Sequence, residues 1–288
     1  MENNKEKVCL IVEGGGFKTG FTSGVIDAFM VSRYNPFDSC IGISGGSVVV
    51  SYFLSRQYRY CLNAMLLLAE DKNFTNYKRT FGEQGYMDIE YIKRVAEREV
   101  PFEINNALNN CKNCDIRFVA THRKSGNPTY LIPNNNNWMD TVVSSCAVPF
   151  LSKAKHRVGD DDYFDGGWSD PIPVKYAYKN GVRKIILVRT WPSGNRTKQS
   201  WADYFGSIYF SSHPGLKKVF ESSYKRYNKA INFIANPPQD LTIHEIAPIK
   251  LLKSTTYSYS RKTIMRDYRY GLDLGMQYVA QQRFKNII

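Results

Sequence analysis

The sequence lacks the long apolar stretches that mark secreted or membrane-spanning proteins. Residues 1–7 are polar, and the apolar run of residues 8–12 ends at Glu13, which is too short for a secretory signal. The longest uncharged stretch, residues 39–55, contains glycines and several serines. A buried strand followed by a helix therefore explains it better than a membrane span. We expect a cytoplasmic protein, with at most peripheral contact with membranes.

Cysteine and histidine are also scarce, with six and four residues. Without a secretory signal, six cysteines indicate reduced thiols rather than disulfides. Cys111 and Cys114 form the only Cys-x-x-Cys pair, and a structural zinc site would need a second pair at similar spacing. None of the histidines has the sequence context of a Ser-His-Asp triad. We therefore expect no metal and no cofactor.

Acidic residues are outnumbered, with 26 Asp and Glu against 39 Lys and Arg, for a net charge of +13. This excess favours anionic partners such as lipid headgroups, nucleic acid or acidic metabolites, but it does not choose among them. Most of it lies after Lys175, where the basic residues alternate with tyrosines. Such a mixture can bind nucleic acid, yet solvated helix faces explain most of it. We expect that nucleic acid is not a partner.

The glycine patterns of nucleotide-binding loops are incomplete. A P-loop ending at Lys18-Thr19 would need glycine at the positions of Phe17 and Val12. A dinucleotide-binding fingerprint starting at Gly14 lacks its third glycine, because Thr19 stands there. These absences argue against a nucleotide site in this segment.

The pattern of apolar residues predicts an α/β protein with a mainly parallel sheet. We expect a main domain over residues 1–190 and a basic, aromatic-rich C-terminal extension over residues 191–288 packed on it. Residues 58–110 are predicted to form a lateral cap of helices. The predicted strands are residues 8–12, 37–43, 115–121, 129–132, 184–188 and 241–246, and the other predicted helices are residues 22–30, 45–54, 138–147, 174–178, 201–209, 216–234 and 262–284.

The most informative stretch is Gly42-Ile43-Ser44-Gly45-Gly46, which separates two apolar runs. It predicts a strand, a sharp turn and a helix, with a serine presented as a nucleophile at the turn. A β-carbon at Gly42 or Gly46 would collide with the adjoining strand or helix. The N–H of Gly45 can face a developing oxyanion. Ser47 is a weaker candidate because it falls inside the helix, and Ser144 and Ser145 are interpreted as helix-packing residues.

Two further segments suit the same chemistry. Strand 8–12 leads into Gly14-Gly15-Gly16 and then a helix, an arrangement that aims backbone N–H groups at an anion. Asp165 follows an aromatic strand end and precedes Gly166 and Gly167, so its carboxylate can project from tight backbone into a crowded site. A partly desolvated carboxylate can deprotonate a serine, since burial raises its pKa.

In this order, the segments Gly14 to Lys18, Gly42 to Gly46 and Asp165 to Gly167 resemble those of the patatin-like phospholipases. The resemblance covers about residues 8–190 and implies a three-layer α/β/α sandwich with a Ser-Asp dyad. By this resemblance Ser44 is the nucleophile and Asp165 the base. The oxyanion hole is then formed by Gly14, Gly15, Gly16 and Gly45, and the motifs are supported by Lys18, Gly42, Gly46, Gly166 and Gly167.

The resemblance implies a serine esterase or lipid acyl hydrolase of the EC 3.1.1 type. Its substrates would be carboxylic esters of phospholipids, lysophospholipids or acylglycerols, cleaved through an acyl-enzyme intermediate. One residue departs from the family pattern, because Thr19 stands where the family usually has glycine. If that position needs a positive φ, threonine would strain the glycine loop. The alternative is therefore a catalytically weak or inactive lipid-binding member of the same fold.

Overall fold

A computed structural model describes residues 6–79, 85–149, 151–152 and 156–285. Within these residues, eight strands form one sheet in the order β5-β6-β3-β2-β1-β7-β8, with β4 also paired to β3. The strands are β1 (Val8–Val12), β2 (Ser39–Ile43), β3 (Asp115–His122), β4 (Pro128–Leu131), β5 (His156–Val158), β6 (Asp161–Asp165), β7 (Lys184–Val188) and β8 (Thr242–Ile246). The run from β3 to β8 is parallel, and β4, β5 and β6 pair antiparallel.

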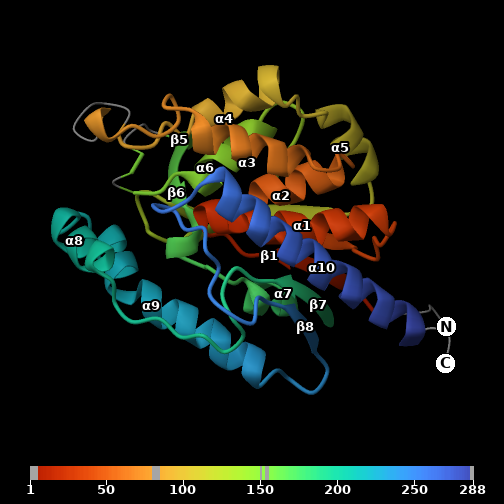
Figure 1. Cartoon of the computed structure of the whole chain (residues 1–288). Coiled ribbons are helices and arrows are strands. Elements are labelled where there is room, and N and C mark those ends of the chain that lie inside the picture. The colour runs from red at the N-terminus through yellow and green to blue at the C-terminus, as the bar shows by residue number, and fades with distance from the viewer. Residues whose placement is uncertain (1–5, 80–84, 150, 153–155, 286–288) are drawn as a thin grey trace.

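Helices cover both faces of this sheet (Figure 1), so the predicted three-layer α/β/α sandwich is confirmed. They are α1 (Thr19–Val31), α2 (Gly45–Leu54), α3 (Tyr60–Glu70), α4 (Tyr91–Arg94) continued by a π-helical turn (Val95–Glu99), α5 (Ile104–Asn110), α6 (Trp138–Cys146), α7 (Val174–Lys179), α8 (Trp201–Tyr209), α9 (Pro214–Ala235) and α10 (Arg261–Lys285). Across the described residues, none of the helices has the length and apolar character needed to cross a membrane.

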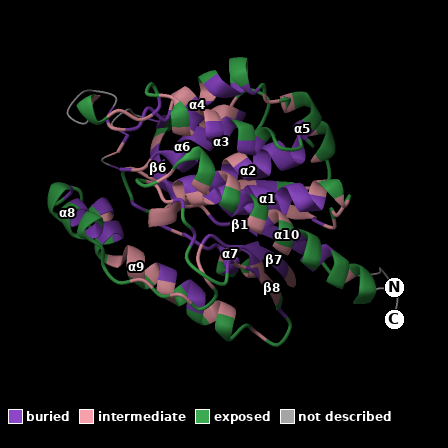
Figure 2. Ribbon diagram, viewed as in Figure 1, coloured by how far each residue is buried: buried purple, intermediate pink, exposed green. Residues whose placement is uncertain are grey.

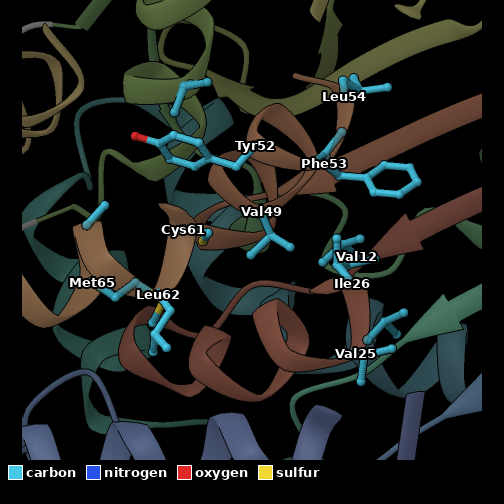
Figure 3. Close-up of a cluster of buried hydrophobic side chains, with 14 of the residues drawn as sticks. Val12, Val25, Ile26, Val49, Tyr52, Phe53, Leu54, Cys61, Leu62 and Met65 are labelled. Atoms are coloured by element: carbon cyan, nitrogen blue, oxygen red, sulfur yellow. The ribbon is translucent and has the colours of Figure 1, made fainter. Parts of the chain in front are cut away.

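The two faces of the sheet explain why the first strand is apolar throughout. Leu10 and Val12 of β1 belong to the larger core, which also contains residues of α1, α2, α3 and α10. Cys9 and Ile11 point into a second core with residues of α7 and α9. Figure 2 shows the central strands as buried, and Figure 3 shows part of the larger core around Val12. A strand covered on both sides needs a continuous apolar run rather than an alternating one.

The residues after 190 contribute to the sandwich itself. Strand β8 pairs in parallel with β7 at the edge of the sheet. Helix α10 lies along α1 at very close range, since a β-carbon on Gly24 would lie 2.1 Å from the Tyr268 carbonyl oxygen. A β-carbon on Gly271 would lie 1.9 Å from the Phe21 carbonyl oxygen. The sheet and one helix layer thus draw on residues from both sides of position 190.

Element boundaries differ from the sequence predictions by a few residues. Helix α9 begins at Pro214, two residues before the predicted start, because proline suits the first turn of a helix. Strand β5 was not predicted, since its three residues, His156, Arg157 and Val158, carry no apolar run. It is an edge strand that pairs only with β6 among the described strands.

Candidate active site

Ser44 stands at a strained turn between β2 and α2. Its backbone has φ 54° and ψ −132°, a conformation that non-glycine residues rarely adopt and that costs about 1–3 kcal/mol. The positions two residues before and after it must be glycine, because there is no room for a β-carbon at either one. A β-carbon on Gly46 would lie 2.2 Å from the Val12 carbonyl oxygen, and one on Gly42 would lie 2.6 Å from the Ser47 Cα. The turn therefore presents the Ser44 side chain in one fixed direction.

Ser145 of α6 supports this turn. Its hydroxyl accepts a hydrogen bond from the Ser44 backbone N–H at 3.0 Å and donates one to the Val119 carbonyl at 2.6 Å. Ser47 is fully buried and hydrogen-bonded to the same hydroxyl at 2.9 Å. The sequence interpretation of Ser145 as a packing residue missed its contact with the turn, because nothing in the local pattern connects α6 to α2.

Asp165 ends β6 and reaches the same point. Its carboxyl accepts a hydrogen bond from the Gly167 N–H at 2.8 Å and lies near enough to the Ser44 side chain for that side chain to lower its pKa. Burial raises the pKa of Asp165 to about 6, although the Ser44 side chain and the Gly167 N–H lower it. Gly166 allows the tight backbone, because a β-carbon there would lie 2.2 Å from the Val119 carbonyl oxygen. A carboxyl that ionises near neutral pH and lies beside a serine hydroxyl can accept its proton.

The glycine loop between β1 and α1 lies against Ser44. A β-carbon on Gly14 would come within 2.6 Å of the Ser44 Cβ. Gly15 and Gly16 have φ values of 146° and 57°, which L side chains rarely adopt. Gly16 opens a short 3-10 turn and Gly45 opens α2, and the N–H groups at the start of a helix lack intrahelical acceptors. Such groups can bind a negatively charged oxygen.

Thr19 does not strain this loop. Its φ is −64°, in the right-handed region that any residue adopts, so the position needs no glycine. The buried Thr19 hydroxyl donates a hydrogen bond to the Gly16 carbonyl, and its side chain lies against Gly45. The departure from the family pattern therefore adds a contact between the glycine loop and the start of α2.

Lys18 is held over an aromatic ring. Its Nζ lies 3.2 Å from the centroid of the Trp191 ring. Burial lowers the pKa of Lys18 to about 8, with Glu13 acting in the opposite direction. A β-carbon on Gly15 would lie 3.3 Å from the Lys18 Cβ. Lys18 thus packs on the loop and on Trp191, and its cation is stabilised by the ring.

A buried ion network, which the sequence did not reveal, anchors the base of the glycine loop. The fully buried Arg189 follows β7 and donates to the Glu13 carboxylate at 3.0 Å and to the Tyr227 hydroxyl of α9 at 2.6 Å. It also forms an ion pair with Glu245 of β8. The Glu13 carboxylate accepts a second bond from the Thr190 N–H at 2.7 Å. Because Glu13 directly precedes Gly14, this network ties the start of the glycine loop to β7, β8 and α9.

Ser44 and Asp165 line a cavity of about 460 Å³. Its other lining residues fall into two chemical sets. One set is apolar and comes mainly from α2, α3, the α4 region and α6, including Val48, Tyr52, Met65, Leu68, Ile92 and Met139. The second set comes from residues after 190 and is more polar, including Trp191, Lys198, Asp203, Tyr224 and Thr256. The cavity can hold a molecule with an apolar chain and a polar end.

A family model described as "Patatin-like phospholipase" matches residues 10–178, more than half of the chain. This chain belongs to the patatin-like phospholipase family. The matched part includes the glycine loop, the turn at Ser44 and Asp165, so the family resemblance seen in the sequence is confirmed. Residues 213–283 match a second model, described as a domain of unknown function, DUF6363. Helix α8 lies between the two matched ranges.

This patatin-like protein is similar to the "Uncharacterized protein YjjU" of Escherichia coli strain K12. The two are 28% identical over 279 residues, which is 95% of this chain and 77% of the relative. Among solved structures, VipD from Legionella pneumophila matches with a TM-score of 0.44 and 13% identity, covering 96% of this chain and 67% of that one. Family membership supports lipid hydrolysis at the level of the family.

Proposed function

We propose that this protein is a lipid acyl hydrolase that cleaves carboxylic esters through Ser44 and Asp165. The observation that carries the proposal is a serine at a strained turn, beside a buried carboxyl, at the wall of a largely apolar cavity. Nucleophilic serine catalysis requires a hydroxyl beside a base that can take its proton. Phospholipids, lysophospholipids and acylglycerols are the substrate classes that fit the family and the cavity.

In the first half of the reaction, the Ser44 hydroxyl oxygen attacks the ester carbonyl carbon and its proton passes to Asp165. The carbonyl oxygen becomes an oxyanion, which faces the N–H groups of Gly14, Gly15, Gly16 and Gly45. Loss of one such donor typically costs about 2.7–4 kcal/mol of barrier. The tetrahedral intermediate then collapses, and Asp165 returns the proton to the departing alkoxide. The alcohol leaves, and the acyl group remains on Ser44.

In the second half, a water molecule replaces the alcohol. Asp165 takes a proton from this water as its oxygen attacks the acyl carbon, and the same N–H groups face the new oxyanion. The bond to the Ser44 oxygen breaks, and that oxygen takes the proton back from Asp165. The products are a free carboxylic acid and the original serine, so one water is consumed for each ester cleaved.

The two sets of cavity residues would bind different parts of the substrate. The apolar set around Met65 and Leu68 would hold the acyl chain, because burying each methylene is worth about 0.8 kcal/mol. The polar set around Lys198 and Tyr224 would face the alcohol part of the ester. Replacing Leu68 by Trp should therefore shorten the acyl chains that are accepted.

Fluorophosphonate labelling of the intact protein, located by peptide mass spectrometry, tests the proposal. We expect rapid labelling of Ser44, loss of labelling in Ser44→Ala and slow labelling in Asp165→Asn. Ser211→Ala, which removes an exposed serine, is the matched control and should be labelled like the wild type. Equal turnover of p-nitrophenyl esters by wild type and Ser44→Ala would contradict the proposal. Absence of labelling in the folded wild type would favour the lipid-binding alternative.

The pH profile tests the role of Asp165. The base must be ionised, so kcat/KM should rise as pH increases through about 6. The folded pKa of Asp165 lies above the unfolded value of about 3.9, so its ionisation destabilises the fold, and Asp165 contributes stability that is lost as pH rises from about 4 to 6. Asp165→Asn should lose the activity and the Asp165 share of this pH dependence, while the share of Asp27, whose pKa burial also raises to about 6, should remain. A kcat/KM profile that is flat between these pH values would exclude Asp165 as the base.

A further inference from the structure

Helix α8 carries its apolar side chains on the outside. Trp201 and Phe205 are 77% and 59% exposed, and Tyr204 and Ile208 are exposed as well. We call these four residues the α8 aromatic face. The rings lie together, with centroids 5.8–6.3 Å apart among Trp201, Tyr204 and Phe205. A surface helix normally turns its apolar side toward the core, and this one does the opposite.

The opposite side of α8 holds the helix to the protein. Gly206 lies so close to α9 that a β-carbon there would come within 2.4 Å of the Phe220 ring. Ser200 and the buried Asp203 form a capping box at the start of the helix, in which the Asp203 carboxylate accepts from the Ser200 N–H and Oγ at 2.7 Å each. Its other carboxylate oxygen accepts from the Ser223 hydroxyl of α9. These contacts fix the orientation of α8, so the exposure of its aromatic face follows from how the helix is attached.

The attached side of α8 borders the cavity that contains Ser44. Thr197, Lys198, Ser200 and Asp203, which lead into α8 or begin it, line this cavity. Figure 1 shows α8 at one end of the molecule beside α9, away from the central strands, and Figure 2 shows its outward side as exposed. A surface that receives the aromatic face would therefore lie across α8 from the cavity, about one helix diameter (~10 Å) away.

The charge of the residues around α8 indicates which kind of partner surface would receive the aromatic face. Residues 191–235 contain seven Lys and Arg but only two acidic residues, Asp203 and Glu221. Asp203 is buried, whereas Lys198, Lys217, Lys218 and Lys225 are exposed. Exposed aromatic rings beside lysines suit the boundary of an anionic bilayer, where Trp and Tyr settle at the headgroup level and each nearby Lys adds attraction.

We propose that the α8 aromatic face docks the protein on anionic phospholipid bilayers. Trp201, Phe205 and their neighbours enter the headgroup region, and the surrounding lysines contact anionic headgroups. This orientation keeps the cavity within about one helix diameter of the bilayer, which shortens the path of a lipid toward Ser44. The choice of a lipid partner rests on the proposed function, but the docking itself needs no chemistry at Ser44.

Vesicle sedimentation in a Ser44→Ala background tests the docking without any turnover. Vesicles of phosphatidylcholine alone are compared with vesicles that also contain phosphatidylglycerol. Trp201→Ser/Phe205→Ser should reduce binding to the mixed vesicles by about tenfold or more. Phe284→Ser removes an exposed ring near the end of α10, at the opposite end of the molecule in Figure 1, and should bind like the parent protein.

Charge reversal tests the second part of the docking. Lys217→Glu/Lys218→Glu should weaken binding to mixed vesicles and should barely change binding to phosphatidylcholine alone. Lys112→Glu/Lys285→Glu makes the same change in net charge at exposed sites in the turn after α5 and at the end of α10, and should have a much smaller effect. Binding of the parent protein should fall as salt concentration rises, because salt screens the headgroup charge.

Two outcomes would overturn the docking proposal. The first is unchanged vesicle binding in the folded Trp201→Ser/Phe205→Ser variant. The second is self-association of the parent protein, seen by size-exclusion chromatography, that these substitutions abolish while vesicle binding persists. Fluorophosphonate labelling of the Ser44 protein separates this result from the proposed function. Vesicle binding without labelling would refute the hydrolase alone, and labelling without vesicle binding would refute the docking alone.

Discussion

Helices α8 and α10 both come from the part of the chain after residue 190, and they treat their apolar side chains in opposite ways. On α10, Gly271 meets α1 at close range, and the apolar residues Ile264, Tyr268 and Val279 are buried with it. On α8, Gly206 makes the close contact, but the apolar residues lie on the other side. Apolar content alone therefore does not indicate which helix completes the core. What indicates it is whether the apolar residues lie on the same side of the helix as the glycine that contacts the neighbouring helix.

The largest expected effect lies in the buried network that ties β8, the strand before α10, to the glycine loop. Arg189→Met would leave Glu13 and Glu245 without their cation and should cost about 3–5 kcal/mol of unfolding free energy, measured by urea denaturation. The control is Arg183→Met, which removes a half-exposed ion pair with Asp240 and should cost about 1 kcal/mol or less. Similar losses in both variants would contradict the network's role.

The next effect concerns the contact between α10 and α1. Gly271→Val would press a side chain onto the Phe21 carbonyl and should cost about 3 kcal/mol, at the upper end of overpacking penalties. Ala280→Val adds the same side chain at an exposed position of α10 and should stay within about 1 kcal/mol. If both variants melt at the wild-type temperature, the two helices do not pack at this distance.

A smaller and local effect is expected where α8 is attached. Asp203→Ala removes the carboxylate half of the capping box and the bond from Ser223, but keeps the bond from the residue 203 N–H to Ser200, and should cost about 1–2 kcal/mol. Amide hydrogen exchange should rise in α8 and leave α10 unchanged. Asp273→Ala, at an exposed position on α10, serves as the control. Faster exchange in α10 after the Asp203 substitution would mean that the two helices unfold together.

The smallest effect is expected on the α8 aromatic face. Tyr204→Ser should change the unfolding free energy by no more than about 0.5 kcal/mol, because the side chain is exposed. Tyr268→Ser on α10 removes a buried ring whose hydroxyl donates to Asp27 at 2.8 Å, and should be clearly less stable. A comparable loss from Tyr204→Ser, measured by thermal unfolding, would show that the α8 face is packed rather than open.

The sequence predicted the strands of the parallel sheet, the turn at Ser44 and the segment that carries Asp165. These features have local signals, since a buried strand is a short apolar run and a sharp turn needs glycine. Ser145 and Arg189 gave no such signal. Ser145 sits in an ordinary helix, and Arg189 follows a strand as any surface arginine might. Their partners, Ser44 and Glu13, lie far away in the chain.

By itself, the sequence determined which segments form the helices and the parallel strands, though not the edge strand β5, and where the backbone can turn sharply enough to present a serine. Neighbouring residues decide these features through sterics and local hydrogen bonding. Only the tertiary structure decided that Asp165 meets Ser44, that Thr19 fits its position without strain, and that the aromatic face of α8 points outward. Each of these depends on contacts between distant segments, which exist only once the sheet and its helices have packed.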